Sequence, residues 1–448
     1  MSQSSMKPIS VGVVGFGTVG SGVVKILIEN KDLISQRVGR EVLIVKIADI
    51  DLERDRGVAV PGDVLTDDYT DILTNPDIDI VVETMGGIDS AQKMILRAVD
   101  KEKHVVTANK ALLAEAGDEI FSAAFEKGVD INFEASVGGG IPIIRTLKEG
   151  LVGDNVQFIF GITNGTCNYI LTRMTEDGME FADALAMAQE LGYAEADPTL
   201  DVEGLDSAHK LAIIIPLTYG VKVPFEDIYV EGISNVDALD ITFAGEMGYK
   251  IKLLSILVHT PDGIEARVHP TLIPFRYLLS NVNYNMNAFY IRGEAVGNIL
   301  LYGQGAGMMP TGTAVVSDVI ELARNVAAGI SERVPPLSFR QDNIRTVTPK
   351  PMDEVTTNYY LRFHAKDQPG VLSKISGILG THNISIFSVI QKGRAEDLDS
   401  VPVVMMTHEA KEKNVRSALR EIDGLDVIEK PSIFYRVEDT SLKEKSHQ

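Results

Sequence analysis

The sequence of 448 residues contains a single cysteine, Cys167, so no disulfide bond can form within the chain. This excludes the disulfide-stabilised class of small secreted domains. The sequence also lacks a start that resembles a signal peptide, and it lacks an uninterrupted apolar run of membrane-spanning length. Together these absences predict a cytoplasmic protein with no membrane partner.

Basic residues are scarce relative to acidic ones. The chain has 42 lysines and arginines against 63 aspartates and glutamates, which gives a formal net charge of -21. A nucleic-acid or anionic-membrane partner would require a basic face that neutralises phosphates. We therefore expect neither partner. Low-complexity sequence is restricted to the polar tail at 441–448, which we expect to be disordered.

The rest of the composition is that of a folded α/β enzyme, with 45% hydrophobic and 23% charged residues. The length exceeds what one hydrophobic core usually organises, so roughly two to four domains are expected.

The N-terminal part begins with a strand predicted over 9–14, and a helix is predicted over 21–30. Glycines between a strand and a helix let the chain turn tightly and approach a pyrophosphate, which the helix N-terminus attracts. An ordinary glycine turn is the alternative, but the alternating α/β pattern that follows favours a dinucleotide site. The loop consists of Gly15, Phe16, Gly17, Thr18, Val19 and Gly20.

Three further apolar runs, at 42–47, 78–82 and 105–106, alternate with helical segments such as 90–100. This order predicts a Rossmann-like, doubly wound parallel sheet. A helix predicted over 313–328 is expected to pack back on this domain.

The C-terminal part has a different order of elements. From Tyr359 onward the pattern predicts a βαββαβ module, which is ferredoxin-like. Its elements are a first strand from Tyr359, a helix at 371–381, strands at 384–391 and 401–407, a helix at 410–422 and a strand at 426–435.

Prolines and changes in the predicted pattern of strands and helices mark the boundaries between these parts. The predicted domains are a nucleotide-binding domain at 1–135 completed by about 308–334, an α+β substrate-binding and dimerisation domain at 136–307, a linker at 335–355, a regulatory module at 356–438 and a tail at 439–448.

An acidic residue, Asp49, follows the second apolar run. A carboxylate at this place usually accepts hydrogen bonds from the adenosine ribose and excludes a 2'-phosphate, which favours NAD. The spacing from the glycine loop is longer than the usual ~20 residues, and Arg54 and Arg56 lie close enough to compensate for a phosphate. Direct ribose contact and a capping or turn role for Asp49 are therefore equally open.

The most informative stretch lies between Gly192 and Leu211, where five carboxylates occur close to one lysine. If 205–215 is helical, Asp206 and Lys210 are four residues apart and can pair. A surface salt bridge is the alternative, and such pairs contribute little. The apolar run after Lys210 indicates a buried helix, in which paired or functional charges are the rule. We therefore favour a functional site.

Taken together, the motifs resemble those of homoserine dehydrogenase, and the resemblance spans about 11–328. It implies reversible hydride transfer, with NAD or NADP, between L-homoserine and L-aspartate 4-semialdehyde in threonine, methionine and isoleucine biosynthesis. No kinase domain precedes the first strand, so we expect the monofunctional form. The motifs are, in chain order, the glycine loop, E-T-M-G-G at 83–87, T-A-N-K at 107–110, E-A-S-V-G-G-G at 134–140, N-G-T at 164–166 and the block from Asp206 to Lys210.

The resemblance also implies roles for single residues. Lys210 would donate the proton to the developing alkoxide, with Asp206 as its carboxylate neighbour. An ammonium can both stabilise and protonate an alkoxide, which supports this role independently. Substrate contacts are implied for Glu195, Asp201, Thr166 and Lys110. Cofactor contacts are implied for the glycine loop, Asp49, Thr84, Lys110, Gly192, Gly305 and Gly307. A monovalent cation such as sodium is implied at Glu134 and at the backbone carbonyls of Val137, Gly139 and Ile141, with a plain glycine-rich hinge as the alternative.

One position departs from the family pattern. Many members carry Lys or Arg immediately before the acidic residue after the second strand, where it can contact the 2'-phosphate of NADP. This chain has Ala48 there. The departure favours NAD or dual use and leaves the choice of cofactor open.

The stretches D-Q-P-G-V-L at 367–372 and N-I-S at 383–385 resemble the signature of an ACT domain. The helix N-terminus after the turn suits the carboxylate of an amino acid. ACT domains usually pair side by side, which implies a homo-oligomer, a dimer or a tetramer, with L-threonine as the expected effector. A purely oligomerising appendage is the alternative. The implied effector residues are Asp367, Gly370, Asn383 and Ile384.

Two other functions fit part of the pattern. A phosphorylating semialdehyde dehydrogenase needs a reactive cysteine with an activating base, and Cys167 lies in a sequence typical of substrate positioning. A non-catalytic amino-acid sensor would not need the lysine and carboxylates that this chain has. Both alternatives are therefore disfavoured.

Overall fold

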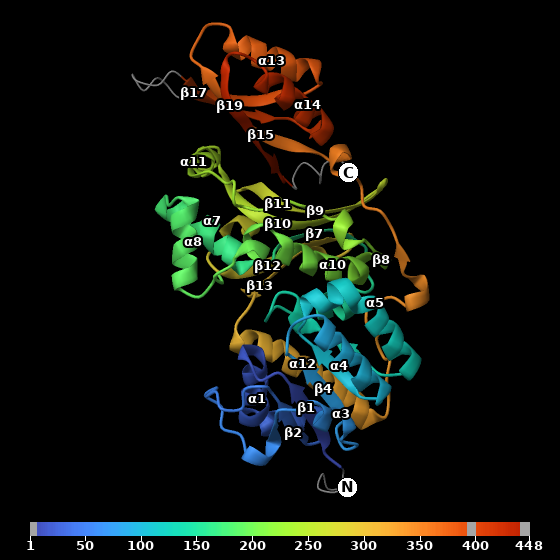
Figure 1. The fold of residues 1–448 in the computed structure, drawn as a ribbon. Coiled ribbons are helices and arrows are strands. Elements are labelled where there is room, and N and C mark those ends of the chain that lie inside the picture. Colours follow the sequence, from blue (N-terminus) through green and yellow to red (C-terminus); the bar gives the residue numbers. More distant parts are fainter. Residues whose placement is uncertain (1–6, 392–399, 440–448) are drawn as a thin grey trace. The chain divides into compact units, whose positions relative to one another are not determined.

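The computed structural model describes residues 7–391 and 400–439 (Figure 1). The tail predicted at 441–448 lies outside the described residues. The chain divides into two compact units, each built from three separate stretches. The first unit comprises Met1–Gly165, Asp206–Ile228 and Met286–Thr348, and the second comprises Thr166–Leu205, Tyr229–Asn285 and Pro349–Gln448.

A six-stranded parallel sheet forms the centre of the first unit, in the order β3-β2-β1-β4-β5-β6. All six residues of β1 are buried, as expected for a parallel strand covered on both faces. The prediction of a doubly wound sheet is confirmed. The strands are β1 (Ile9–Val14), β2 (Val42–Ala48), β3 (Leu65–Thr66), β4 (Ile80–Glu83), β5 (His104–Thr107) and β6 (Ile131–Asn132).

Among the described residues, six helices accompany this sheet, and the last of them comes from much later in the chain (Figure 1). A side chain at Gly22 would collide with the carbonyl of Met308, so the first turn of α12 lies directly against α1. The helix predicted at 313–328 is confirmed and begins earlier, at Met308. The helices are α1 (Thr18–Glu29), α2 (Lys31–Val38), α3 (Thr70–Thr74), α4 (Asp89–Asp100), α5 (Lys110–Lys127) and α12 (Met308–Ala328).

The rest of the first unit adds an antiparallel sheet and one long helix. Strand β12 (Met286–Gly293) pairs with β7 (Val156–Ile162) and with β13 (Gly297–Gln304). Helix α10 (Leu205–Tyr219) carries the acid and lysine pair and is buried along most of its length. The short elements are η2 (Gly62–Val64), η3 (Glu134–Ser136), α6 (Ile143–Arg145), η4 (Thr146–Gly150), η5 (Phe225–Asp227), η7 (Gln341–Asn343) and the paired strands β8 (Val221–Lys222) and β14 (Arg345–Thr346).

The second unit is organised by a sheet in the order β10-β11-β19-β15-β17-β16. Its strands are β10 (Tyr249–Thr260), β11 (Gly263–Pro274), β15 (Thr356–Lys366), β16 (Ile386–Gln391), β17 (Ser400–Thr407) and β19 (Ile428–Val437), with β9 (Tyr229–Val230) beside β11 and β18 (Ala410–Lys411) beside β15. Its helices are α7 (Gly165–Asp177), α8 (Phe181–Glu190), α9 (Thr199–Val202), α11 (Ala238–Glu246), α13 (Val371–Thr381) and α14 (Glu412–Asp423), with short turns η6 (Leu278–Asn281) and η8 (Met352–Glu354).

The C-terminal βαββαβ order is confirmed, but every element except α13 has a boundary that differs from the prediction by one to three residues. Helix α14 begins at Glu412 instead of Ala410. The reason is that Ala410 pairs with Thr357 of β15, and this places the residue in a short strand. The apolar faces of α13 and α14 pack on strands β15 and β17 and form a separate hydrophobic core.

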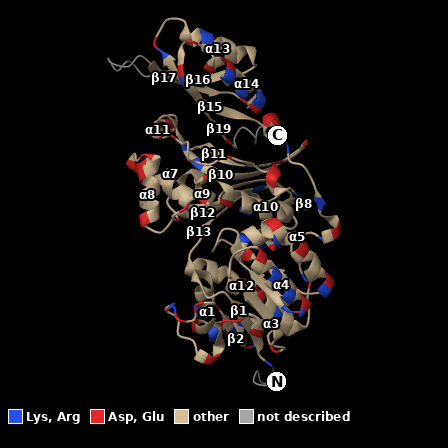
Figure 2. Ribbon diagram, in the orientation of Figure 1, with Lys and Arg blue, Asp and Glu red and all other residues tan. Residues whose placement is uncertain are grey.

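Charged residues of both signs lie side by side on helices such as α4 and α14, whereas α8 carries acidic residues alone (Figure 2). In residues 7–391 and 400–439, none of the helices has the length and hydropathy that a membrane span requires.

Candidate active site

The predicted lysine lies on α10 and is 8% exposed. Its ammonium group donates to the backbone carbonyl of Thr163 at 2.6 Å and to Oδ2 of Asp206 at 2.7 Å. One helical turn separates Lys210 from Asp206, as the spacing predicted. The lysine is therefore held by one charged and one neutral acceptor.

Asp206 bridges two lysines. Its Oδ1 lies 2.7 Å from Nζ of Lys110, and its Oδ2 accepts from the side-chain amide of Asn164 at 2.9 Å. Burial alone would raise the pKa of Asp206, but the charges of Lys210 and Lys110 outweigh burial and hold the pKa well below its ordinary range. Lys110 is the first residue of α5, and its side chain is 43% exposed. The cluster thus pairs a buried carboxylate with one buried and one accessible ammonium.

The carbonyl of Thr163 also accepts from the side-chain amide of Asn287 at 2.9 Å. Asn287 lies on β12 and is 1% exposed, and a side chain at Gly305 would collide with it. Asn287 was not predicted from the sequence, because it lies in a strand without a recognisable motif. The oxygen of this amide is buried without a hydrogen-bond partner among the described residues.

The glycine loop has the geometry of a nucleotide site. Gly15 has a φ of +97°, and a side chain there would run into the backbone of Thr84. A side chain at Gly20 would strike the carbonyl of Gly15, whereas the space around Gly17 is open. Helix α1 begins at Thr18, and no side chain of the described residues caps it. Its first backbone amides are therefore suited to a phosphate.

Asp49 contacts the loop directly. Its Oδ2 accepts from the backbone amide of Phe16 at 2.6 Å, and its Oδ1 accepts from the guanidinium of Arg56 at 3.0 Å. Arg56 also donates to the carbonyl of Phe16 at 2.5 Å and stacks over its ring, 4.9 Å from the centroid. The aspartate thus has a turn-stabilising role, and an arginine compensates its charge.

A buried glutamate organises the loops after β4 and β5. Both oxygens of Glu83 are used: one accepts from Thr107 Oγ1 at 2.5 Å, and the other accepts from the backbone amides of Met85 and Gly86 at 2.9 and 3.2 Å. Burial raises the pKa of Glu83 in spite of these bonds. Asn109 donates to Gly87, and it accepts from an amide of the first turn of α5, where Lys110 begins the helix. Neither Glu83 nor Asn109 was assigned a role from sequence.

The residues predicted for a cation form a different kind of cluster. The carboxylate of Glu134 accepts from the backbone amides of Ile144 and Arg145, both at 2.8 Å, and its own amide donates to Asp318 at 2.7 Å. Burial raises the pKa of Glu134 to about 7 and that of Asp318 to about 8. Among the described residues, no group of three or more His, Cys, Asp or Glu side chains could hold a metal ion.

The three backbone carbonyls predicted for the cation lie in the turn that follows. Residues Val137 and Ile141 are buried, and Gly139 has a φ of +56°. The carbonyl of Ile141 accepts from the amide of Ile143 at 2.8 Å.

Of the residues predicted to bind substrate or cofactor, four belong to the second unit, whereas Lys210, Asp206 and Lys110 belong to the first. Thr166 is buried in the first turn of α7, and its hydroxyl donates to the carbonyl of Tyr193 at 2.6 Å. Asp201 lies in α9. Glu195 is exposed, and Gly192 has a φ of +73°. Of the cofactor residues, Gly307 lies in the first unit as the N-cap of α12.

The predicted effector residues flank α13: Asp367 and Gly370 precede its N-terminus, and Asn383 and Ile384 follow its C-terminus. Gly370 has a left-handed conformation, with a φ of +90°, and is exposed immediately before the helix. Asp367 is half-buried at the end of β15, Asn383 is exposed with a φ of +58°, and Ile384 is buried. The turn therefore has the strand, glycine and helix order that the sequence predicted.

Comparisons with known proteins identify the family. The sequence matches the family models of the homoserine dehydrogenase NAD binding domain at residues 15–134, of homoserine dehydrogenase at 142–320 and of the ACT domain at 359–426. The homoserine dehydrogenase of Neisseria gonorrhoeae is 47% identical, with 97% of this chain and 99% of that protein covered. The homoserine dehydrogenase of Pseudomonas aeruginosa is 44% identical with the same coverage.

A solved structure leads to the same conclusion. The crystal structure of a homoserine dehydrogenase from Thiobacillus denitrificans is 46% identical and superposes with a TM-score of 0.91 over 97% of this chain and 99% of that chain. With its parallel nucleotide-binding sheet, its buried acid and lysine cluster and its C-terminal ACT domain, the chain belongs to the homoserine dehydrogenase family of nicotinamide-dependent oxidoreductases.

Proposed function

We propose that this protein interconverts L-homoserine and L-aspartate 4-semialdehyde, with Lys210 as the residue that moves the proton. The observation that carries this proposal is the buried carboxylate of Asp206 between the two ammonium groups of Lys210 and Lys110. An ammonium in a site of low exposure can neutralise the charge that develops on a carbonyl oxygen. The nicotinamide, when bound, supplies or accepts the hydride.

In the reducing direction, Lys210 gives a proton to the aldehyde oxygen as that oxygen becomes an alkoxide. In the oxidising direction, the neutral amine takes the hydroxyl proton of homoserine. Asp206 holds the amine in place and does not itself transfer a proton, because two lysines keep it ionised. Lys110 lies on the accessible side of the same carboxylate, where we assign it to both substrate and nicotinamide.

The substrate ammonium needs acidic partners, and we assign Glu195 and Asp201 to it. Thr166 supplies a further substrate contact from the start of α7. Thr84, Gly192, Gly305 and Gly307 are assigned to the cofactor. These assignments follow the family motifs, and the domain boundaries proposed from sequence go with them.

For the cofactor we propose that both NAD and NADP are accepted. The pairing of Asp49 with Arg56 supports this, because the charge that would repel a 2'-phosphate is compensated by a guanidinium. A hyperthermophilic archaeal homoserine dehydrogenase that is 27% identical, with a TM-score of 0.60, has been solved in complex with NADPH. A phosphate-binding role for Arg56 would therefore be in keeping with that relative.

Three further proposals concern ligands and assembly. A monovalent cation such as sodium is assigned to Glu134 and to the carbonyls of Val137, Gly139 and Ile141. L-threonine is assigned to the ACT domain at Asp367, Gly370, Asn383 and Ile384. Pairing of ACT domains would make the protein a homo-oligomer, a dimer or a tetramer.

One assay tests the central proposal: oxidation of L-homoserine with NAD and with NADP, each with and without L-threonine. We expect turnover with both cofactors and a change in rate with L-threonine. Oxidation of homoserine releases a proton and reduction of the semialdehyde consumes one, so oxidation should be favoured as the pH rises. Phosphate-dependent oxidation of the semialdehyde, abolished by alkylation of Cys167, would instead indicate a phosphorylating dehydrogenase.

A further inference from the structure

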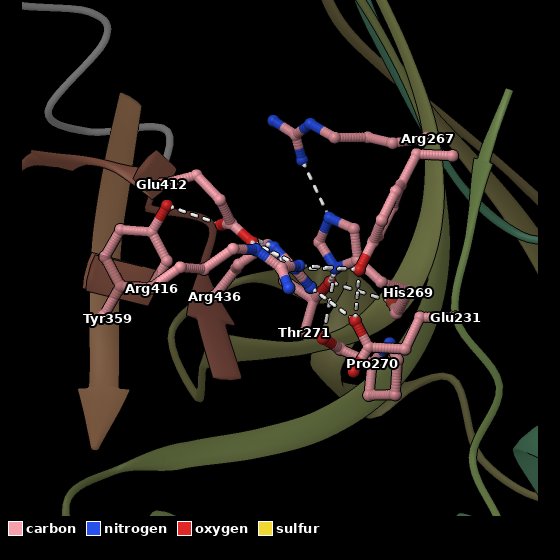
Figure 3. A network of polar contacts seen from close by, with 10 residues as sticks. Glu231, Arg267, His269, Pro270, Thr271, Tyr359, Glu412, Arg416 and Arg436 are labelled. Carbon is pink, nitrogen blue, oxygen red and sulfur yellow. Dashed lines mark hydrogen bonds and ion pairs between the residues drawn. The ribbon is translucent and has the colours of Figure 1, made fainter. Parts of the chain in front are cut away.

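A partly buried network of charged side chains joins the ACT domain to strand β9 within the second unit (Figure 3). Arg436 on β19 is 1% exposed. Its guanidinium donates to both oxygens of Glu412 on α14, at 2.6 and 3.0 Å, and to Oε2 of Glu231 at 2.8 Å. Glu231 immediately follows β9, so one arginine of the ACT domain binds a carboxylate on each side.

Tyr229 strengthens the same junction. Its hydroxyl donates to Oε2 of Glu231 at 3.0 Å and accepts from Arg416 at 3.0 Å and from Arg436 at 3.2 Å. The guanidinium of Arg436 also lies 5.1 Å from the centre of the tyrosine ring. Burial alone would raise the pKa of Glu412, but its bonds to Arg436 outweigh this and lower it. The junction is therefore ionic and geometrically specific.

Strand β9 continues directly into a contact with α9. The backbone amide of Ile233 donates to the carbonyl of Val202 at 2.7 Å, and the hydroxyl of Ser234 donates to the carboxylate of Glu203 at 2.5 Å. A side chain at Gly232 would collide with the same carbonyl of Val202. Residues 229–234 thus form one short, hydrogen-bonded connection between the ACT domain and α9.

Helix α9 contains Asp201, which we assign to the substrate ammonium. The carbonyl of Asp201 accepts from the thiol of Cys167 at 3.1 Å. Cys167 follows Thr166 on α7. The segment that carries Asp201 is therefore fixed on one side by α7 and on the other side by residues 232–234.

We propose that Tyr229 and Glu231 are positioning residues that hold α9 in register for the substrate ammonium, with Arg436 of the ACT domain as their anchor. The inference rests on the proposed function, since it takes Asp201 as the ammonium ligand. Energetic coupling between distant sites is carried by contiguous chains of packed and hydrogen-bonded groups such as this one. Through these residues the ACT domain sets the affinity for homoserine and leaves the hydride step unchanged.

The decisive variant is Glu231→Gln, which keeps the shape of the side chain and removes its charge. We expect KM for L-homoserine to rise about fivefold or more, the range of a typical coupling, while kcat and KM for the cofactor stay near wild type. Tyr229→Phe should act in the same direction with a smaller effect. Hydrogen exchange at the amide of Ile233 should become faster in Glu231→Gln, because its bond to Val202 loosens.

A matched control lies on the next helix. Asp237, at the start of α11, bonds to Arg362 at 2.8 Å, and Arg362 is buried like Arg436. The exposed fractions of the two carboxylates are similar, 44% for Asp237 and 36% for Glu231. Asp237→Asn should therefore weaken an equivalent junction without changing KM for homoserine.

An unchanged homoserine KM in Glu231→Gln, or an equal rise in Asp237→Asn, would overturn the inference. The thermal midpoints of both variants show whether a change in KM reflects general loosening, which would also count against it. Failure of the proposed function is separate: it would appear as no homoserine oxidation by the wild type, or as an unchanged homoserine KM in Asp201→Asn.

Discussion

The first unit contains two clusters with buried carboxylates, and the two clusters differ in the charge of the groups next to those carboxylates. Asp206 lies between Lys210 and Lys110, and its pKa is held low. Glu134 and Asp318 lie next to each other, with backbone amides and Arg145 around them, and burial raises both pKa values, to about 7 and about 8. Burial is similar in the two places, so the charge of the neighbours decides whether a carboxylate is ionised. The first arrangement suits chemistry with protons, and the second makes stability depend on pH.

The largest expected effect comes from removing the lysine that gives the first cluster its function. Lys210→Ala should lower kcat for homoserine oxidation by about 10²- to 10⁴-fold, the usual contribution of a positioned general acid or base. Steady-state kinetics with circular dichroism of the folded variant provides the measurement. Turnover within a few-fold of wild type would show that another group moves the proton.

A smaller effect is expected at the carboxylate of the same cluster. Asp206→Asn should lower kcat by about ten- to a hundredfold, the range expected when a partner orients a reacting group without reacting itself. The same assays as for Lys210 apply, so the two variants can be compared directly. If Asp206→Asn were the more damaging of the two, Asp206 would have to take part in the proton transfer.

The second cluster, Glu134 and Asp318, should make the free energy of unfolding depend on pH. Without a bound cation, Glu134 and Asp318 bind protons more tightly in the folded chain than in the unfolded chain, where carboxyl pKa values lie near 4. Between about pH 4 and pH 8 the folded state therefore holds more protons, and the free energy of unfolding falls as the pH rises. Asp318→Asn should reduce this fall by about 1–3 kcal/mol. Denaturant unfolding at pH 5 and pH 8 measures it.

Glu321→Gln is the control for that experiment. It removes another carboxylate partner of Arg145, at 2.7 Å, but lies outside the buried acid pair. An equal change of slope in both variants would assign the pH dependence to Arg145 instead of to the acid pair.

A third carboxylate, that of Asp49, extends the comparison, because a single arginine, Arg56, compensates its charge. Arg56→Ala should weaken NADP binding about tenfold, as expected for loss of one charge-assisted contact, and leave NAD binding nearly unchanged. The fluorescence of NADPH and NADH on titration gives both affinities without turnover. Arg54→Ala is the matched control, since only the backbone carbonyl of Arg54 is bonded to Arg56. Equal losses for both cofactors would refute a role in selectivity.

What the sequence predicted well was local. Strand β1 and helix α13 have the predicted bounds, and the spacing of Asp206 and Lys210 gave their pairing, because each depends on periodicity within a few residues. Helix α1 begins at Thr18 instead of Ser21, since the glycine loop itself forms the first turn. Glycine has a low helix propensity, so the presence of Gly20 led to a predicted helix start that was too late.

The contacts that could not be predicted join residues far apart in the chain. Asn287 meets the carbonyl of Thr163 because β12 runs beside β7, and Glu83 meets Thr107 because β4 runs beside β5. Arg56 contacts the ring of Phe16 through a loop without regular structure. None of these pairs has a signature in the local sequence, since each depends on how strands and loops meet.

The packing of α12 against α1 has a consequence for how the protein is made. A ribosome delivers the sheet and its first five helices early, but the helix that closes the domain against Gly22 begins only at Met308. Until α12 has been synthesised, the face of α1 that packs against it remains uncovered. The segments between the two helices either fold during this time or remain unfolded. We infer that the nascent cofactor domain is exposed to aggregation and to chaperones for most of its synthesis.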